Sequence, residues 1–158
     1  MRLLLKALVP DFAWPETLEE GIIDLEVKCQ PAGRRRKSPS RIDMVISAKS
    51  NGTRFGAVVE VKTGRQKVIN PLPAYTSHVR EGYGLWPADC EFGRANAAFV
   101  VLVPRASPKL QRRLSHVRNR HWKIVEWPVL LRRLEARILH DSQDFRHFRK
   151  AIWDTVDV

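Results

Sequence analysis

The dipeptide Asn51-Gly52 constrains the fold of this chain more than any other feature, because it stands between two short, largely apolar runs. A two-residue type I′ turn needs positive φ at both central positions, and Asn-Gly is the sequence that adopts it most readily. The flanking segments, 41–48 (RIDMVISA) and 55–62 (FGAVVEVK), are therefore predicted to form an antiparallel hairpin. A turn of this length also fixes the register, since residues equally far from it on either side must pair.

Counting outward from the turn brings two carboxylates together. The count places Asp43 opposite Glu60 and Arg41 opposite Lys62. Directly opposed side chains have Cβ atoms about 5 Å apart, so the two acids repel unless something neutralises them. A hard divalent cation such as Mg²⁺ binds carboxylate oxygens and removes that repulsion. The register thus predicts a metal site; two ordinary salt bridges, with Arg41 or Lys62 as the cations, are the alternative.

Lys62 projects from the same face of its strand as Glu60, because it follows two residues later. An ammonium group beside a metal site can position the attacking water and stabilise negative charge that develops during hydrolysis. We therefore interpret Lys62 as a catalytic group.

The rest of the sequence completes an α/β pattern. Alternation predicts a half-buried strand over 22–30, with Ile23, Leu25, Val27 and Cys29 inward. The uninterrupted apolar run 97–104 is typical of a strand covered on both faces. Helices are expected at 1–9, from Pro73 to about Gly82, at 108–119 and within 128–156, and a short strand at 122–127. We predict one α/β domain over 1–158: a mixed sheet of about five strands, the first three antiparallel, then a parallel crossover, with flanking helices, those at 128–156 packing on the core.

The charge balance favours a polyanionic partner. The 158 residues include 28 Lys and Arg against 17 Asp and Glu, a net charge of +11. Cations on this scale favour nucleic acid, ahead of an anionic membrane surface, although a merely solubilising charge is the alternative. No apolar run reaches the roughly 18 residues that a membrane span needs, and the two cysteines lack metal-site spacing. We expect a cytoplasmic protein that is not inserted in a membrane.

Two basic clusters are candidates for contact with phosphate. Four consecutive cations in the loop between the first two strands lie on the route to Asp43, and with Arg41 they are predicted to bind nucleic acid: Arg34, Arg35, Arg36 and Lys37. Arg112, Arg113, Arg118 and Arg120 form a second cluster around the helix expected at 108–119. A solvated loop and a polar helix face are the corresponding alternatives.

Asp43 lies on the expected second core strand, a hairpin follows it, and Glu60-Val61-Lys62 ends the hydrophobic third strand. This arrangement resembles the PD-(D/E)xK nuclease superfamily, which has the restriction-endonuclease-like fold. The resemblance implies metal-dependent hydrolysis of phosphodiester bonds, with a DNA endonuclease as the leading expectation. It implies that Asp43, Glu60 and the Val61 carbonyl bind Mg²⁺, for which Mn²⁺ can substitute, and that Lys62 is the catalytic lysine.

The sequence departs from the family pattern at two points. Ile42 stands where a proline often precedes the Asp, and residues 1–9 contain no acid where many members carry a metal-binding Glu on the first helix. Glu19 or Glu20, just before the first strand, is the upstream candidate for that ligand.

Some relatives also have a Gln and a Tyr on the helix after the lysine strand, and Gln66 and Tyr75 are loosely placed to match. Helix packing is the alternative for Tyr75. The departures leave open a catalytically inactive relative that binds nucleic acid or a protein partner, and a subunit that works as a homodimer.

Overall fold

The computed structural model describes residues 1–29, 40–62, 72–73, 75–76, 96–116, 119–137, 143, 146–147 and 149–150. The helices are α1 (Arg2–Leu8), α3 (Pro108–Ser115) and α4 (Trp127–Glu135), and the strands are β1 (Glu19–Cys29), β2 (Ser40–Ser50), β3 (Thr53–Val61), β4 (Ala97–Val103) and β5 (Trp122–Glu126). Residues 72–73 and 75–76 are also helical.

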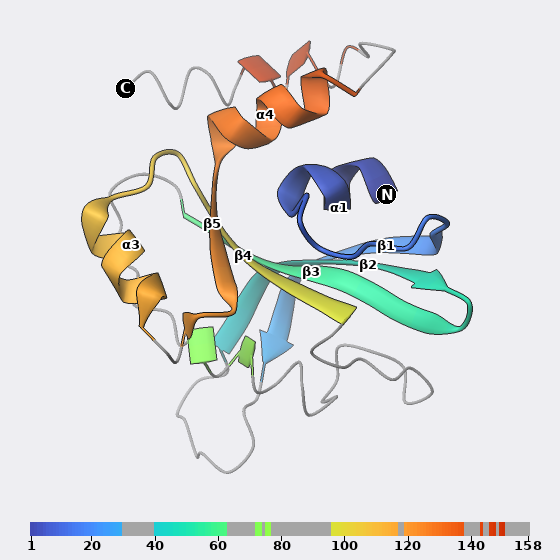
Figure 1. The fold of residues 1–158 in the computed structure, drawn as a ribbon, viewed down its shortest axis with the longest axis horizontal. Helices are drawn as coiled ribbons and strands as arrows, with labels where there is room; N and C mark the ends of the chain where they lie inside the picture. Colours follow the sequence, from blue (N-terminus) through green and yellow to red (C-terminus); the bar gives the residue numbers. More distant parts are fainter. Residues whose placement is uncertain are drawn as a thin grey trace.

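The five strands form one mixed sheet in chain order, β1-β2-β3-β4-β5 (Figure 1). The first three are antiparallel, whereas β4 runs parallel to β3 and β5 parallel to β4. Parallel neighbours need a crossover, and the long segment between β3 and β4 and the α3 segment between β4 and β5 supply it. The predicted α/β class and the predicted order of strand directions are confirmed.

The β2–β3 turn has the predicted conformation and register. Asn51 and Gly52 have φ values of 49° and 75°. Ser50 pairs with Thr53, and the ladder continues without a slip to the pair Met44 and Val59.

Apolar side chains cover both faces of the central strands. On one face Val58 and Val101 pack with Leu110 and Leu114 of α3 and with Tyr75. On the other face Val59 and Val100 pack with α1 and α4, which lie on the same side of the sheet in Figure 1. All seven residues of β4 are buried, as the continuous apolar run predicted.

The edge strand β1 differs from its prediction. It begins at Glu19, and a register shift separates Glu19 from Ile22. The expectation that Ile23 and Leu25 face inward is wrong: they are 49% and 69% exposed. As an edge strand β1 has a sheet neighbour on one side only, so alternation alone does not bury either face. Val27 is partly buried against the α3 side of the core, and the side chain of Cys29 lies outside the described part.

Helix α3 begins as predicted and ends early. The Ser107 side chain accepts a hydrogen bond from the Leu110 N–H, and Pro108 occupies the first turn. The helix stops at Ser115 because His116 is extended and the Asn119 side chain donates to the Arg113 carbonyl.

Helix α4 has Pro128 in its first turn and buries Leu130, Leu131 and Leu134. Most of the predicted C-terminal helix and of the helix expected to end near Gly82 lies outside the described residues. Within the described ranges, no helix is long and apolar enough to cross a membrane.

Candidate functional site

Glu60 and Lys62 form a buried ion pair at the end of β3. Glu60 is fully buried, and Lys62, just beyond the last strand residue, is 8% exposed. The Lys62 ammonium contacts Glu60 Oε1. The Lys62 main-chain N–H also donates to the Leu102 carbonyl at 2.8 Å, which fixes the lysine against β4. The two charges therefore share the interior face of β3, as the two-residue spacing predicted.

Asp43 reaches β3 through its side chain. Its Oδ2 accepts a hydrogen bond from the Val61 N–H at 2.7 Å, just past the pair Met44 and Val59 where the main-chain ladder ends. Ile42 and Val45 belong to the same core layer although they are three positions apart, so β2 departs from strict alternation across Asp43. The carboxylate thus takes the place of a main-chain acceptor where β2 leaves β3.

Burial and a neighbouring negative charge raise the pKa of Glu60. Burial is the main cause that raises the pKa of Glu60 to about 7, and the Asp43 carboxylate raises it further, against the opposing effect of Lys62. Asp43 and Glu60 are therefore close enough to interact, as predicted from the turn, and the ionised form of Glu60 depends on nearby positive charge.

Tyr75 supports β2 from the helical segment at 72–76. Its hydroxyl donates to the Arg41 carbonyl at 2.6 Å, two residues before Asp43. Its ring packs near Trp122, with ring centroids 6.4 Å apart, and the Trp122 indole donates to Thr76. The structure places Tyr75 against the main chain of the Asp43 strand, as a packing residue would lie; its accessory role in the site stays a prediction.

The β1–β2 register brings an acidic residue that the sequence prediction missed to the strand position opposite Asp43, but its side chain is 74% exposed and pairs with Arg41 instead of joining Asp43 and Glu60. The pairs Leu25 with Met44 and Val27 with Ile42 place Glu26 opposite Asp43. Glu26 has a φ of 51° and its carboxylate accepts a hydrogen bond from the exposed Arg41 side chain at 2.9 Å. Its position could not be derived from the sequence, because no tight turn fixes the register across the 30–39 loop.

The structure does not bring Glu19 or Glu20 to Asp43. Glu19 pairs with Lys49, and the Glu20 carboxylate lies 2.6 Å from the Lys49 amine. Lys49 is six positions from Asp43 along β2, roughly 20 Å at the rise of a strand. The basic loop (Arg34, Arg35, Arg36 and Lys37) and Gln66 lie outside the described residues.

The oxygen donors at this position suit a hard cation. Asp43 and Glu60 supply two carboxylates, and Mg²⁺ commonly keeps several waters beside one or two protein carboxylates. A cation bound here would share Glu60 with Lys62, which already contacts Oε1. Among the described residues, no three His, Cys, Asp or Glu side chains gather as a ready metal-binding group.

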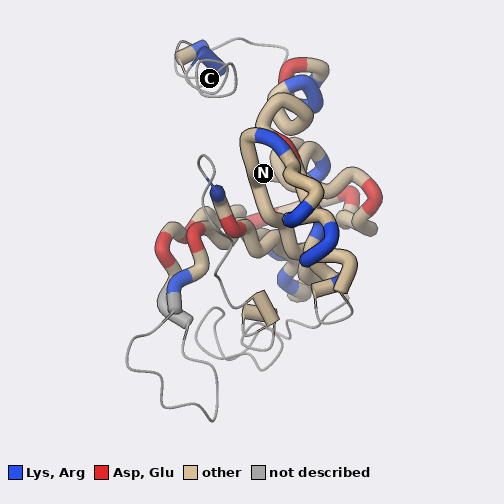
Figure 2. Tube along the Cα trace, turned by 90° about the vertical axis from the view of Figure 1, so that its left-hand side faces the viewer, with Lys and Arg blue, Asp and Glu red and all other residues tan. Residues whose placement is uncertain are grey.

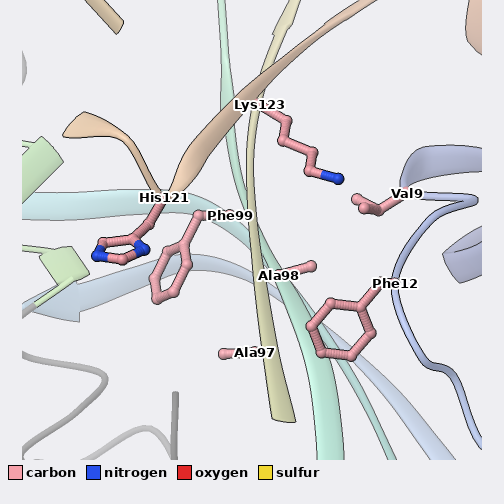
Figure 3. A pocket seen from close by; sticks show the side chains of 7 residues that line it. All are labelled: Val9, Phe12, Ala97, Ala98, Phe99, His121 and Lys123. Carbon is pink, nitrogen blue, oxygen red and sulfur yellow. The ribbon is translucent and has the colours of Figure 1, made fainter. Parts of the chain in front are cut away.

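A separate cavity of about 330 Å³ lies at the other end of β4. Ala97, Ala98 and Phe99 at the start of β4 line it, with Phe12, Lys123 and others around it (Figure 3). Since β3 and β4 run parallel, the start of β4 is remote from Glu60. The cavity is not part of the carboxylate site.

Comparisons of this chain with protein-family models, with curated proteins and with solved structures find no match.

Proposed function

We propose that this protein hydrolyses phosphodiester bonds in nucleic acid, with DNA as the expected substrate and Mg²⁺ as the expected metal, in the manner of the PD-(D/E)xK nucleases and their restriction-endonuclease-like fold. One observation carries the proposal. The side chains of Asp43, Glu60 and Lys62 meet where β2 separates from β3.

Each group has a role that its position supports. Asp43 and Glu60, with the Val61 carbonyl, would hold the ion. A bound Mg²⁺ would supply Lewis-acid chemistry, polarising a phosphate oxygen and lowering the pKa of a bound water. The Lys62 ammonium is held by Glu60, and the Lys62 main-chain N–H is bonded to β4. This ammonium would position the water and stabilise charge that develops on the phosphate.

The test is cleavage of plasmid, single-stranded DNA and RNA with Mg²⁺, Mn²⁺ or EDTA. We expect metal-dependent cutting that falls by roughly a hundredfold or more in Asp43→Asn, Glu60→Gln and Lys62→Met, because each removes a charge from the site. Glu20→Gln, which changes a remote acid, is the matched control and should cut normally. Cutting in EDTA, or full activity in the three site variants, would contradict the proposal.

A second candidate is a nuclease-like domain that binds nucleic acid or a protein partner without cutting. The observation that favours it is the Lys62–Glu60 ion pair, which already neutralises the more buried carboxylate. Binding of nucleic acid that needs no metal and survives Glu60→Gln, with no cutting under any metal, would identify this case.

A further inference from the structure

Helix α3 presents an exposed basic face. Its apolar residues, Leu110 and Leu114, are buried, whereas Lys109, Arg112 and Arg113 are all exposed. The sequence contains no Asp or Glu between Glu91 and Glu126, although many cations fall in that stretch. The positive charge of α3 is therefore not offset by acids of its own segment.

The buried side of α3 packs on the sheet face to which Glu60 belongs. Leu110 and Leu114 share a core cluster with Val58 and Val101. Val58 is two residues before Glu60 on β3, and Val101 is the partner of Glu60 on β4. Helix α3 and the Glu60 side chain thus lie on one side of the sheet.

The segment that follows β4 also brings the start of α3 to the end of the strands at which Glu60 and Lys62 lie. Leu102 pairs with Val61 in the parallel ladder, and the chain reaches Pro108 shortly after β4 ends at Val103. Figure 2, seen from the side on which α3 lies in Figure 1, shows blue Lys and Arg segments on the coil nearest the viewer.

A polyanion needs this charge if it is to approach the site. Lys62 offsets the charge of Glu60, but the Asp43 carboxylate beside it repels phosphate at short range. The exposed cations of α3 offset that repulsion from the same side of the sheet as the Glu60 side chain. Arginine suits the task because its planar guanidinium matches the geometry of phosphate oxygens.

We propose that the α3 basic face, defined as Lys109, Arg112 and Arg113 with the flanking Arg105 and Arg120, binds the phosphate backbone of the nucleic acid that enters the Asp43–Glu60 site. The contacts are with phosphates and carry no base sequence. This inference rests on the proposed function for the identity of the ligand, but it concerns binding, which can be measured without cutting.

The chain offers a closely matched control on α4. Arg112 donates through Nε to the carbonyl of Pro108, and Arg132 donates in the same way to the carbonyl of Pro128, each four residues earlier in a helix that has proline in its first turn. Helix α4 packs on the opposite face of the sheet. The double variant Lys109→Gln/Arg112→Gln is therefore compared with Arg132→Gln/Arg137→Gln, which also removes two exposed cations, one on α4 and one just past its end.

The measurement is the anisotropy of a labelled DNA duplex, titrated at several salt concentrations in EDTA with Glu60→Gln as the background. We expect the α3 variant to bind DNA roughly tenfold more weakly. The slope of log K against log salt should become shallower by about 1.8, because each of the two lost phosphate contacts contributes about 0.9. The α4 variant should match the background, and Arg112→Lys, which keeps the charge, should keep the slope. Circular dichroism and thermal melting verify that each variant is folded.

The inference fails if the folded α3 and α4 variants bind DNA with equal affinity and equal salt slope. It also fails if neither the background protein nor the unsubstituted chain binds DNA. The two proposals fail separately. If the unsubstituted protein cuts DNA but the α3 variant binds normally, only the α3 inference fails. If binding depends on α3 but no metal supports cutting, only hydrolysis fails.

Discussion

A buried carboxylate that holds an ammonium group is costly, and Glu60 shows how the fold accommodates one. Its carboxylate has no exposure to solvent, so burial favours the protonated acid, while Lys62 favours the anion. Replacing such a pair with apolar residues often stabilises a protein. The buried pair is therefore weak evidence of added stability.

The raised pKa of Glu60 predicts how stability depends on pH in the absence of metal. Folding raises the pKa of Glu60 from its ordinary value of 4.5 to about 7. Because the unfolded chain releases the carboxyl proton first, the free energy of unfolding should fall as the pH rises from 4.5 to about 7, by up to about 3 kcal/mol in total. Urea unfolding in EDTA at a series of pH values measures this.

The Glu60→Gln variant has no proton to lose at this position, so its profile should be flatter over the same range. Glu20→Gln is the control, because hydrogen bonding to Lys49 lowers the pKa of Glu20, a shift in the direction opposite to that of Glu60. An equally steep fall in Glu60→Gln would assign the pH dependence to another group.

Among individual residues, the meeting of Asp43 with Glu60 could be predicted from the sequence, because the Asn51-Gly52 turn alone sets the register between their two strands. The sequence did not allow the contact between Asp43 and the Val61 N–H to be predicted. That contact depends on a local departure of β2 from alternation, which residue types do not encode. Glu26 was missed for a related reason, since its neighbour across the sheet is set by a loop of unspecified geometry.

Among the elements, α1 is small but structurally important. Leu5 and Leu8 enter the core layer with α4, and the Arg133 side chain donates to the Ala7 carbonyl at 3.0 Å. The first helix therefore joins an element from the far end of the described chain to the sheet.

Two leucines on α1 test this contribution. Leu5 is fully buried and Leu3 is 50% exposed. We expect Leu5→Ala to lower the free energy of unfolding by about 2–5 kcal/mol, because it leaves a cavity, and Leu3→Ala to change it by less than about 1 kcal/mol. Chemical denaturation measures both, and similar effects at the two positions would show that α1 does not pack as described.

Strong local signals made most elements predictable. The Ser107 cap with Pro108 and the apolar run of β4 each specify their element within a few residues. Burial on β1 was predicted wrongly, because alternation shows which residues share a face but not whether another layer covers that face.

Across the whole molecule, the sheet ends in a strand that combines charged residues with exposed apolar ones. Ile22, Ile23 and Leu25 are exposed on β1, which occupies the edge of the sheet. An edge strand has unpaired N–H and C=O groups that can pair with another chain.

We therefore expect the protein to self-associate weakly through β1. Leu25→Lys should reduce that association, because a charge on an edge strand opposes pairing, and should change the free energy of unfolding by less than about 0.5 kcal/mol. Sedimentation velocity over a range of concentrations measures association. Leu3→Lys, which changes a half-exposed leucine on α1, is the control; unchanged association in Leu25→Lys would exclude this edge.

The hydrogen bond that the Asp43 carboxylate accepts from the Val61 N–H also bears on the order in which the strands assemble. The β2–β3 hairpin closes over a two-residue turn, whereas the pairing of β4 with β3 joins residues more than thirty positions apart in the sequence. Loop closure favours the local pairing first. Asp43 would then come close to β3 before β4 is present to bury Glu60, so the acids would meet while water still screens their repulsion. Arrival of β4 would complete the desolvation of a pair of strands that is already in register.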